Sequence, residues 1–325
     1  MRTRRWLLAA SAALASLPAL PRLARADAWP TGPIRAIVPF APGSATDTIA
    51  RLFAEAMRPT LGQPIVVENR PGANGLIAAE QVARATPDGH TILFGTNSTH
   101  AAADALFKRV PYDIERDFVA ISTLATVPLV AIVNAASPYR TLADLIAAAK
   151  ARPESVSFGT ASSSQLVAAR TLARMADIRL LEVPFRSSPQ VVQEVIAGRL
   201  DLFVADVAVT LPAIRGGQVR ALGVTTKARV PQLPEVLPIA EQGLPHYEIF
   251  AWFVLVAPAG VPRVAVDKLG AAVRAASADA TVKDRLETTL GMTLFTSTPE
   301  AAAAFVRSER QRWTAMVRAA GIEPE

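Results

Sequence analysis

Short apolar runs alternate with segments in which apolar residues recur every three or four positions. The run at 33–40 predicts a β-strand, and the spacing from Ile49 to Met57 predicts an amphipathic helix that ends at Gly62. The same alternation continues with a strand, a helix and a strand at 64–69, 75–85 and 91–96. This order of elements predicts a parallel sheet with helices on both faces.

The alternation starts again after an apolar run at 118–124. Thr141 and Asp144 form a capping-box signature before a helix that extends to Arg152. Ser188 followed by Pro189 marks the start of another helix, which Gly198 closes. Strands are predicted at 127–134, 156–160, 178–185, 200–206 and 219–226. These elements indicate a second α/β unit.

A last strand-like run at 248–257 precedes a helical C-terminal region. Helices are predicted at 263–276, 280–290 and 299–320, the last of them capped by Thr298. The chain passes between the two units near residues 125 and 250, which predicts a hinged pair of domains. The first domain comprises 27–125 and the returning segment 251–325, and the second comprises 126–250.

The N-terminus has the three-part layout of a secretory signal. Arginines at 2, 4 and 5 precede an apolar stretch at 6–20, which is shorter than a typical membrane span. Ala24-Arg25-Ala26 provides a small-residue cleavage site, so 1–26 is expected to be a signal peptide cleaved after Ala26. The paired arginines leave two export routes open, the general secretory route and the twin-arginine route. Both deliver the protein out of the cytoplasm.

The charge of the chain is concentrated in that segment. The 325 residues carry a formal charge of +6, and five of the 34 Lys and Arg residues lie within 1–26. Without the segment, the chain contains 29 basic and 28 acidic residues. This balance gives no support for nucleic-acid binding, which needs a basic surface. The absence of cysteine excludes thiol nucleophiles and thiolate metal sites.

Three predicted strands lead into turns rich in glycine and serine that precede helices. These strand–turn–helix segments are 39–47, 69–75 and 158–164. Each places free backbone N–H groups and a helix N-terminus, which attract anions, at the carboxyl end of a strand. Ligands bind at that edge in open α/β sheets. The three turns together predict a site for a small anion that needs no metal or cofactor.

Enzymatic motifs are weak in comparison. The histidines at 90, 100 and 246 match no short metal-ligand spacing, and neither a G-x-S-x-G elbow nor a P-loop occurs. Asp47 and Asp206 are candidate general bases, but Asp47 at a helix start is more simply a loop-stabilising carboxylate. The serines at 162–164 have no assignable base. These observations favour a binding protein over an enzyme.

Several motifs resemble those of the tripartite tricarboxylate transporter substrate-binding proteins, also called the Bug family. The first are Pro39-Phe40-Ala41-Pro42-Gly43 with Asp47, and Val67-Glu68-Asn69-Arg70-Pro71-Gly72-Ala73. The likeness continues at 86–91, 96–100, 111–118 and 183–186, and then at 211–222 and 257–260. The motifs are modest individually, but their order and spacing cover essentially the whole chain after residue 26.

This resemblance implies a periplasmic binding protein of the venus-flytrap, type II-like class, with a mixed sheet flanked by helices in each domain. It implies a monomer without cofactors that captures a small organic carboxylate and delivers it to the membrane permease subunits of a tripartite transporter. A pincer formed by the first two turns should hold the carboxylate. The residues expected to face the ligand are Phe40, Gly43, Ser44, Ala45, Thr46, Asp47, Ala73, Asn74, Gly75, Thr96, Ser98, Thr99, Ser162, Ser163, Ser164, Phe185, Arg186, Ser187 and Asp206.

Two features bear on the identity of the ligand. Ser44, Ala45, Asn74 and Ala103 depart from residues common in the family. Asp206 disfavours an anionic group at the far end of the ligand, or selects an amine or a hydroxyl there, whereas Arg186 serves a second anionic group or lies solvated at the rim. Two other functions remain open: an exported α/β enzyme that acts on a similar acid, and a receptor used only for signalling.

Overall fold

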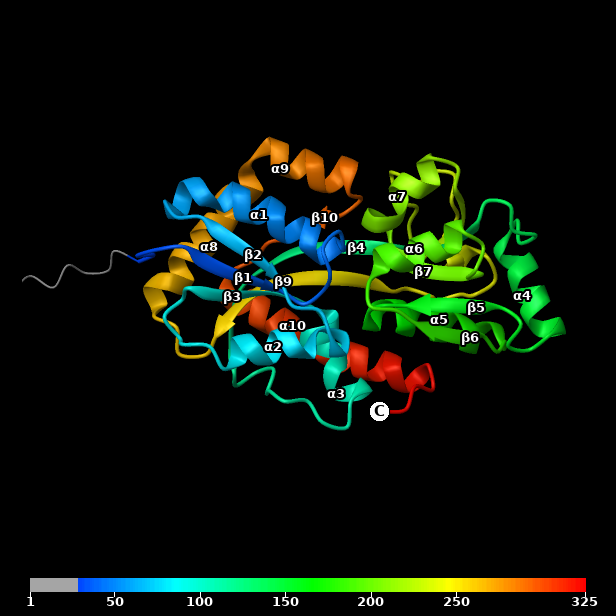
Figure 1. Cartoon of the computed structure of the whole chain (residues 1–325), viewed down its shortest axis with the longest axis horizontal. Helices are drawn as coiled ribbons and strands as arrows, with labels where there is room; N and C mark the ends of the chain where they lie inside the picture. Colours follow the sequence, from blue (N-terminus) through cyan, green and yellow to red (C-terminus); the bar gives the residue numbers. More distant parts are fainter. Residues whose placement is uncertain (1–28) are drawn as a thin grey trace, which may run out of the picture.

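The computed structural model describes residues 29–325, so the predicted signal peptide and its cleavage site lie outside the described residues. Two α/β units lie side by side, and the long strand β4 (Phe118–Asn134) passes from one to the other (Figure 1). The first unit contains the chain up to β4 and the C-terminal helices, and the second contains most of the chain between β4 and β9 (Phe250–Pro258). The predicted organisation into two α/β units is therefore present, while the boundaries at 125 and 250 stay a prediction.

The sheet of the first unit is mixed. Its strand order is β2-β1-β3-β9-β4, and the short strand β10 also pairs with β4. β1 runs parallel to β2 and β3, whereas β9 is antiparallel to both of its neighbours. Besides β4 and β9, the strands are β1 (Ile34–Val38), β2 (Ile65–Asn69), β3 (Thr91–Thr96) and β10 (Thr293–Leu294).

Helices cover both faces of this first sheet. α1, α8 and α9 lie on one side in Figure 1, and α2, α3 and α10 lie on the other. The helices are α1 (Ala45–Leu61), α2 (Leu76–Ala83), α3 (Ala103–Leu106), α8 (Arg263–Ala278), α9 (Ala280–Asp284) and α10 (Pro299–Ala319). Single turns of 3₁₀ or π geometry form η1 (Ala73–Gly75), η2 (Ser98–Ala102) and η4 (Arg285–Thr289).

The second unit repeats this architecture on a smaller scale. β5 runs parallel to β6 and β7, and β4 is antiparallel to β7 and β8. Its further strands are β5 (Ser157–Thr160), β6 (Leu181–Pro184), β7 (Leu202–Asp206) and β8 (Val219–Val224). Its helices are α4 (Leu142–Ala151), α5 (Ser163–Ala176), α6 (Ser188–Ile196), α7 (Val207–Arg215) and the turn η3 (Ile239–Glu241).

The sheet prediction from strand–helix alternation is correct for six strands and wrong for the others. Strands β1 to β3 and β5 to β7 form parallel sets, as expected where helices form the crossovers. β4, β8, β9 and β10 pair antiparallel, which gives the mixed sheets that the family resemblance implied. The runs 118–124 and 127–134 also form one strand, whose register shifts between Ala120 and Ser122 and again between Thr123 and Ala125.

Most helix signals read from the sequence coincide with helix ends. Gly62 ends α1 in the left-handed conformation, at φ 68°, and Thr141 and Asp144 form a complete capping box at α4. The N-cap of α6 is Ser187 and not Ser188, because Ser188 already has helical geometry. The helix expected at 280–290 is interrupted, since α9 ends at Asp284 and a π-turn follows.

Helix α10 is attached to the sheet by a buried polar contact. Glu309 is 6% exposed, and its Oε2 accepts hydrogen bonds from the indole N–H of Trp252 at 2.8 Å and of Trp313 at 3.1 Å. Trp252 belongs to β9, so this contact joins the C-terminal helix to a strand at the centre of the first sheet. Within residues 29–325, no helix combines the length and the apolar character that a membrane span requires.

Candidate functional site

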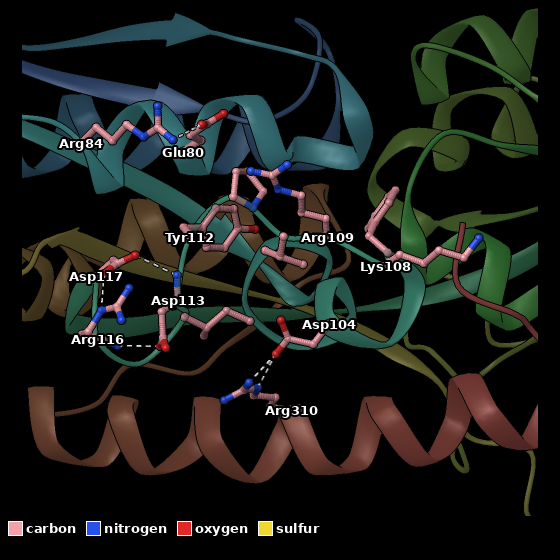
Figure 2. Close-up of a pocket in the computed structure, with 14 residues that line it drawn as sticks. Glu80, Arg84, Asp104, Lys108, Arg109, Tyr112, Asp113, Arg116, Asp117 and Arg310 are labelled. Atoms are coloured by element: carbon pink, nitrogen blue, oxygen red, sulfur yellow. Dashed lines mark hydrogen bonds and ion pairs between the residues drawn. The ribbon is translucent and has the colours of Figure 1, made fainter.

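A cavity of about 790 Å³ lies between α2, α10 and the segment 107–117 (Figure 2). Most of its acidic side chains are paired with neighbouring arginines. Glu80 pairs with Arg84 at 2.6 Å, and Arg310 of α10 pairs with Asp104. None of its lining residues directly follows the carboxyl end of a strand, where α/β proteins bind ligands. This cavity is therefore not the candidate site.

Two adjoining cavities lie instead where the parallel strands end. All six parallel strands, β1 to β3 and β5 to β7, contribute residues at or just after their carboxyl ends, and Phe40 lines both cavities. The inner cavity, of about 20 Å³, is lined by Phe40, Ser44, Ala45, Thr46, Thr96, Asn97, Ser98, Ser162, Ser164, Ser188, Asp206, Ala251 and Phe253. The outer cavity, of about 470 Å³, is lined by Phe40, Pro71, Gly72, Ala73, Asn74, Gly75, Ala161, Phe185 and Arg186.

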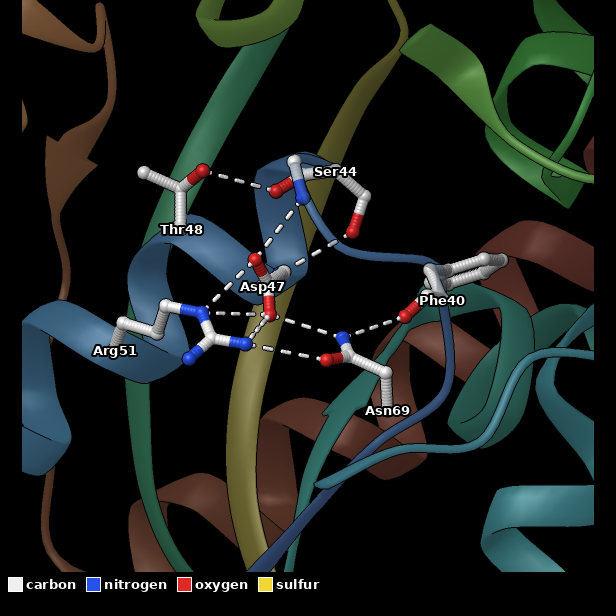
Figure 3. A network of polar contacts seen from close by, with 7 residues as sticks. Phe40, Ser44, Asp47, Thr48, Arg51 and Asn69 are labelled. Atoms are coloured by element: carbon white, nitrogen blue, oxygen red, sulfur yellow. Dashed lines mark hydrogen bonds and ion pairs between the residues drawn. The ribbon is translucent and has the colours of Figure 1, made fainter. Parts of the chain in front are cut away.

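The turn between β1 and α1 is fixed from behind by Asp47. Its carboxylate accepts hydrogen bonds from the Gly43 N–H at 3.0 Å, from Arg51 Nε at 3.1 Å and from Asn69 Nδ2 at 2.9 Å (Figure 3). Burial opposes ionisation of this group, but these hydrogen bonds outweigh it and hold the pKa of Asp47 below its usual range. The same Asn69 amide donates to the Phe40 carbonyl at 2.9 Å, which fixes the start of the turn.

Asp47 therefore lies beside the cavities and not in their lining. Its position fits the loop-stabilising role suggested by the sequence, and Gly43 likewise contributes through its N–H to Asp47. Ser44 caps α1, because its Oγ accepts from the Asp47 N–H at 3.2 Å. Ala45 and Thr46, at the first turn of α1, line the inner cavity.

The turn after β2 has an unusual backbone. Gly72, Ala73, Asn74 and Gly75 all have positive φ, at 142°, 44°, 54° and 92°. A Cβ on Gly75 would lie 2.9 Å from Pro39 Cβ and 2.8 Å from a Thr99 methyl, so only glycine fits there. Asn74 Oδ1 is buried without a hydrogen-bond partner among the described residues. This turn forms one wall of the outer cavity.

The side chains of the turn after β3 point in two directions. Ser98 reaches the second unit, where its Oγ accepts from the Ser163 N–H at 3.2 Å. Thr99 faces the interior of the first unit, since its Oγ1 accepts from the Thr96 N–H at 3.0 Å and contacts His100 Nδ1 at 2.8 Å. Burial lowers the pKa of His100 to about 3, so the imidazole is neutral. Thr99, predicted to face the ligand, is placed behind the cavity lining.

The second unit contributes helix starts and hydroxyl groups. Ser162 and Ser164 lie at the beginning of α5, with their Oγ atoms 3.0 Å apart. Gln165 orders this region, because its Oε1 accepts from the Ala161 N–H at 2.8 Å and its Nε2 donates to Ser188 Oγ at 2.7 Å. The Ser163 Oγ is buried without a partner among the described residues, and Ser163 lines neither the inner nor the outer cavity.

Most of the remaining predicted residues line one of the two cavities. Phe185 and Arg186 line the outer cavity, whereas Ser187, the N-cap of α6, lines neither. Asp206 ends β7, lines the inner cavity and is 8% exposed. Burial raises the pKa of its carboxyl to about 6, partly opposed by hydrogen bonds from its own backbone N–H and from Gln165.

Sequence reasoning missed two polar residues of this region, Asn97 and Gln165. Asn97 lies between the predicted residues Thr96 and Ser98, so its position directly after β3 could have identified it as a site residue. Its Nδ2 is buried without a partner among the described residues. In the described part of the chain, no cluster of three or more His, Asp or Glu side chains is arranged to hold a metal ion.

Comparison with known proteins gives consistent matches over nearly the whole chain. The profile of the family described as "Tripartite tricarboxylate transporter family receptor" matches residues 49–322. A UPF0065 protein from the tcbD-tcbE intergenic region of Pseudomonas sp. (strain P51) is 42% identical, and the match covers 95% of this chain and 92% of that protein.

Two solved structures share the fold. The R. palustris protein Rpa4515 with adipate has a TM-score of 0.88 and 32% sequence identity, over 91% of this chain and all of that one. The periplasmic binding protein BugD has a TM-score of 0.87 at the same identity and the same coverage of both chains. The predicted two-domain venus-flytrap fold of a periplasmic binding protein is thereby confirmed.

Proposed function

This chain belongs to the tripartite tricarboxylate transporter receptor family of solute-binding proteins, and on that premise we propose that it captures a small organic carboxylate in the two adjoining cavities. The observation that supports this most is the convergence of six strand ends on one site, whose outer cavity is lined by Arg186 and by the turn that leads into α2. Backbone N–H groups at helix starts favour negative charge.

The outer cavity is the proposed position of the carboxylate. Arg186 lines it, and the positive-φ turn of Ala73 and Asn74 presents successive backbone N–H groups, an arrangement that binds anions. Charge-assisted hydrogen bonds are about twice as strong as neutral ones, so a carboxylate gains most from these donors. The related protein Rpa4515, whose structure is described with the dicarboxylate adipate, supports the same ligand class.

The proposal is tested with a ligand identified by native mass spectrometry of the freshly purified protein. Calorimetry then compares the acid with its methyl ester, and the ester should bind more weakly by about 2 kcal/mol, because the donors of the outer cavity lose a charged partner. Arg186→Gln should weaken binding of the acid and leave that of the ester nearly unchanged. Arg199→Gln, which removes an exposed pair with Glu194, is the matched control. Equal affinities for acid and ester would refute carboxylate recognition.

We also propose that ligand binding closes the two units around the cavities. Ser98 and Ser163 already form a hydrogen bond between the units, so a ligand that contacts both sides adds to an existing contact. Small-angle scattering should show a smaller radius of gyration with saturating ligand. An unchanged radius would contradict closure but would leave carboxylate recognition standing.

Transport is the proposed purpose of this binding. The family supports delivery of the ligand to membrane subunits of a tripartite transporter, after export to the periplasm and cleavage behind Ala26. N-terminal sequencing of the exported protein tests the cleavage site. Uptake of labelled ligand by cells with and without the gene tests transport. Loss of a ligand response without loss of uptake would favour the signalling role, and turnover of bound ligand, followed by NMR, would favour an enzyme.

A further inference from the structure

One acidic side chain lies in the inner cavity among neutral groups. The residues that line this cavity with Asp206 have apolar, hydroxyl or amide side chains. Asp206 is also the N-cap of α7, and the starts of α1, α5 and α6 line the same cavity. Their backbone N–H groups favour negative charge, which Asp206 itself can supply. The inner cavity thus already contains its own carboxyl group.

The outer cavity has the opposite character. Arg186 is the one charged side chain that lines it, and the two cavities adjoin at Phe40. A molecule that extends through both therefore meets a cation at one end and Asp206 at the other. Charged side chains on neighbouring elements form pairs of their own, namely Asp47 with Arg51, Arg170 with Glu182, and Glu194 with Arg199.

Asn97 specifies the chemistry at the Asp206 end. Its side chain is 1% exposed, and its Nδ2 donor has no partner among the described residues. Asn97 and Asp206 face a common volume of about 20 Å³, which is close to the ~10–15 Å³ that a single water molecule requires. One small polar group therefore has to serve both side chains.

A hydroxyl is the group that satisfies both. It donates its hydrogen to the Asp206 carboxylate and accepts from Asn97 Nδ2. An ammonium group has no acceptor for Asn97, and a carboxylate has no donor and places a second negative charge beside Asp206. We propose that the inner cavity selects a hydroxyl, so that the ligand is a small hydroxy acid whose carboxylate lies in the outer cavity. This inference rests on the proposed carboxylate-binding function.

The ionisation of Asp206 determines how the affinity for each ligand should change with pH. Burial raises the pKa of Asp206 to about 6. A hydroxyl donor stabilises the ionised carboxyl, so the affinity for a hydroxy acid should fall as the pH drops below about 6. A second carboxylate requires Asp206 to be protonated, so the affinity for a dicarboxylate should rise over the same interval, by up to roughly tenfold per pH unit.

Calorimetry with four acids of similar length tests the end group: butyrate, 4-hydroxybutyrate, 4-aminobutyrate and succinate. Their homologues from three to six carbons are included, and the length that binds most tightly is used. At pH 8 the hydroxy acid should bind at least about tenfold more tightly than the methyl-ended acid and than the dicarboxylate, as expected for one charge-assisted hydrogen bond. The amino acid should fall between them.

Variants test whether Asp206 and Asn97 cause the preference for a hydroxyl. Asp206→Asn should abolish the pH dependence, weaken the hydroxy acid about fivefold to twentyfold and strengthen the dicarboxylate, since a charged acceptor becomes neutral. Asn97→Leu should weaken the hydroxy acid while the pH dependence persists. Glu194→Gln, which removes a carboxylate outside both cavities, is the control. It should change neither the affinity for the hydroxy acid nor the pH dependence of that affinity. The pKa of Asp206, followed by NMR in the unmodified protein, should fall when the hydroxy acid binds.

Each outcome separates the two proposals. If no carboxylate of any length binds, the proposed function fails and the inference fails with it. If carboxylates bind but the dicarboxylate is tightest at every pH, or if the Asp206 pKa does not fall with the hydroxy acid, the inference is wrong and the proposed function stands. An unchanged pH profile in Asp206→Asn also overturns it.

Discussion

The carboxylate of Asp47 should stabilise the protein measurably, because it fixes the turn between β1 and α1 from behind. It is 4% exposed and accepts hydrogen bonds from the Gly43 N–H, Arg51 and Asn69. In Asp47→Asn, one carboxylate oxygen becomes an NH₂ group, so at least one of these donors faces another donor. The substitution keeps the size of the side chain, and the lost interactions are therefore electrostatic.

The expected loss is about 2–4 kcal/mol in the free energy of unfolding at pH 7. Hydrogen bonds to charged groups contribute roughly 1.5–3 kcal/mol each, and a buried donor left unpaired adds a desolvation cost. The Arg51 side chain is 54% exposed, so its ion pair with Asp47 contributes only about 1 kcal/mol or less of this total. The part-buried contacts of the carboxylate with Gly43 and Asn69 supply the rest.

Urea denaturation followed by tryptophan fluorescence measures the effect. Asp267→Asn is the matched control, because Asp267 forms the same kind of i,i+4 pair with Arg263 on an exposed helix surface and should cost less than about 0.5 kcal/mol. The pKa of Asp47 is lowered in the folded protein, so its stabilisation is present above the unfolded pKa and is lost as the pH falls through the folded value. Equal losses in the two variants, or a difference that persists in strong acid, would refute the reasoning.

Three further outcomes are expected. Gly75→Ala should lower the free energy of unfolding by about 1–3 kcal/mol, since its Cβ would overlap Pro39 at positive φ, whereas Gly62→Ala, with open space around its Cβ, should cost about 1 kcal/mol or less in thermal unfolding. Glu309→Ala should cost about 2–4 kcal/mol by the same assay because two indole N–H groups lose their acceptor, and Glu309→Gln should cost clearly less. His100 should stay neutral in NMR spectra down to about pH 4, and an imidazolium signal at pH 5 would contradict this. Since its folded pKa of about 3 lies below the unfolded value, the buried imidazole makes the protein less stable as the pH falls below about 6.5.

Local chemistry explains why several structural features follow from the sequence. Gly62 ends α1 because only a residue that tolerates positive φ continues the chain there, and the Thr141 and Asp144 pair satisfies free N–H groups at the start of α4. The turns after the first two strands were recognisable from their glycine, proline and serine content. Such signals depend on residues close together in sequence, so one chain segment suffices to predict them.

The sequence predicts a candidate site at the strand ends for the same reason. Strand ends in a parallel set lie at one edge of a sheet, so residues such as Ser44, Asn74 and Asp206 were expected to meet. The direction of each side chain was not predictable, because it depends on partners far along the chain. Ser98 contacts Ser163, 65 residues away, and Asp47 is held by Asn69, 22 residues away.

The sequence by itself determined the alternation of elements, the ends of most helices and the positions of the glycine-rich and serine-rich turns at strand ends, since each follows from short-range periodicity and backbone geometry. Only the tertiary structure decided that β4 is one strand shared by two mixed sheets, and that Asn97 and Asp206 face a common volume of about 20 Å³. Pairing between strands and burial of polar groups are set by contacts between distant segments. Those contacts exist only after both units have packed together.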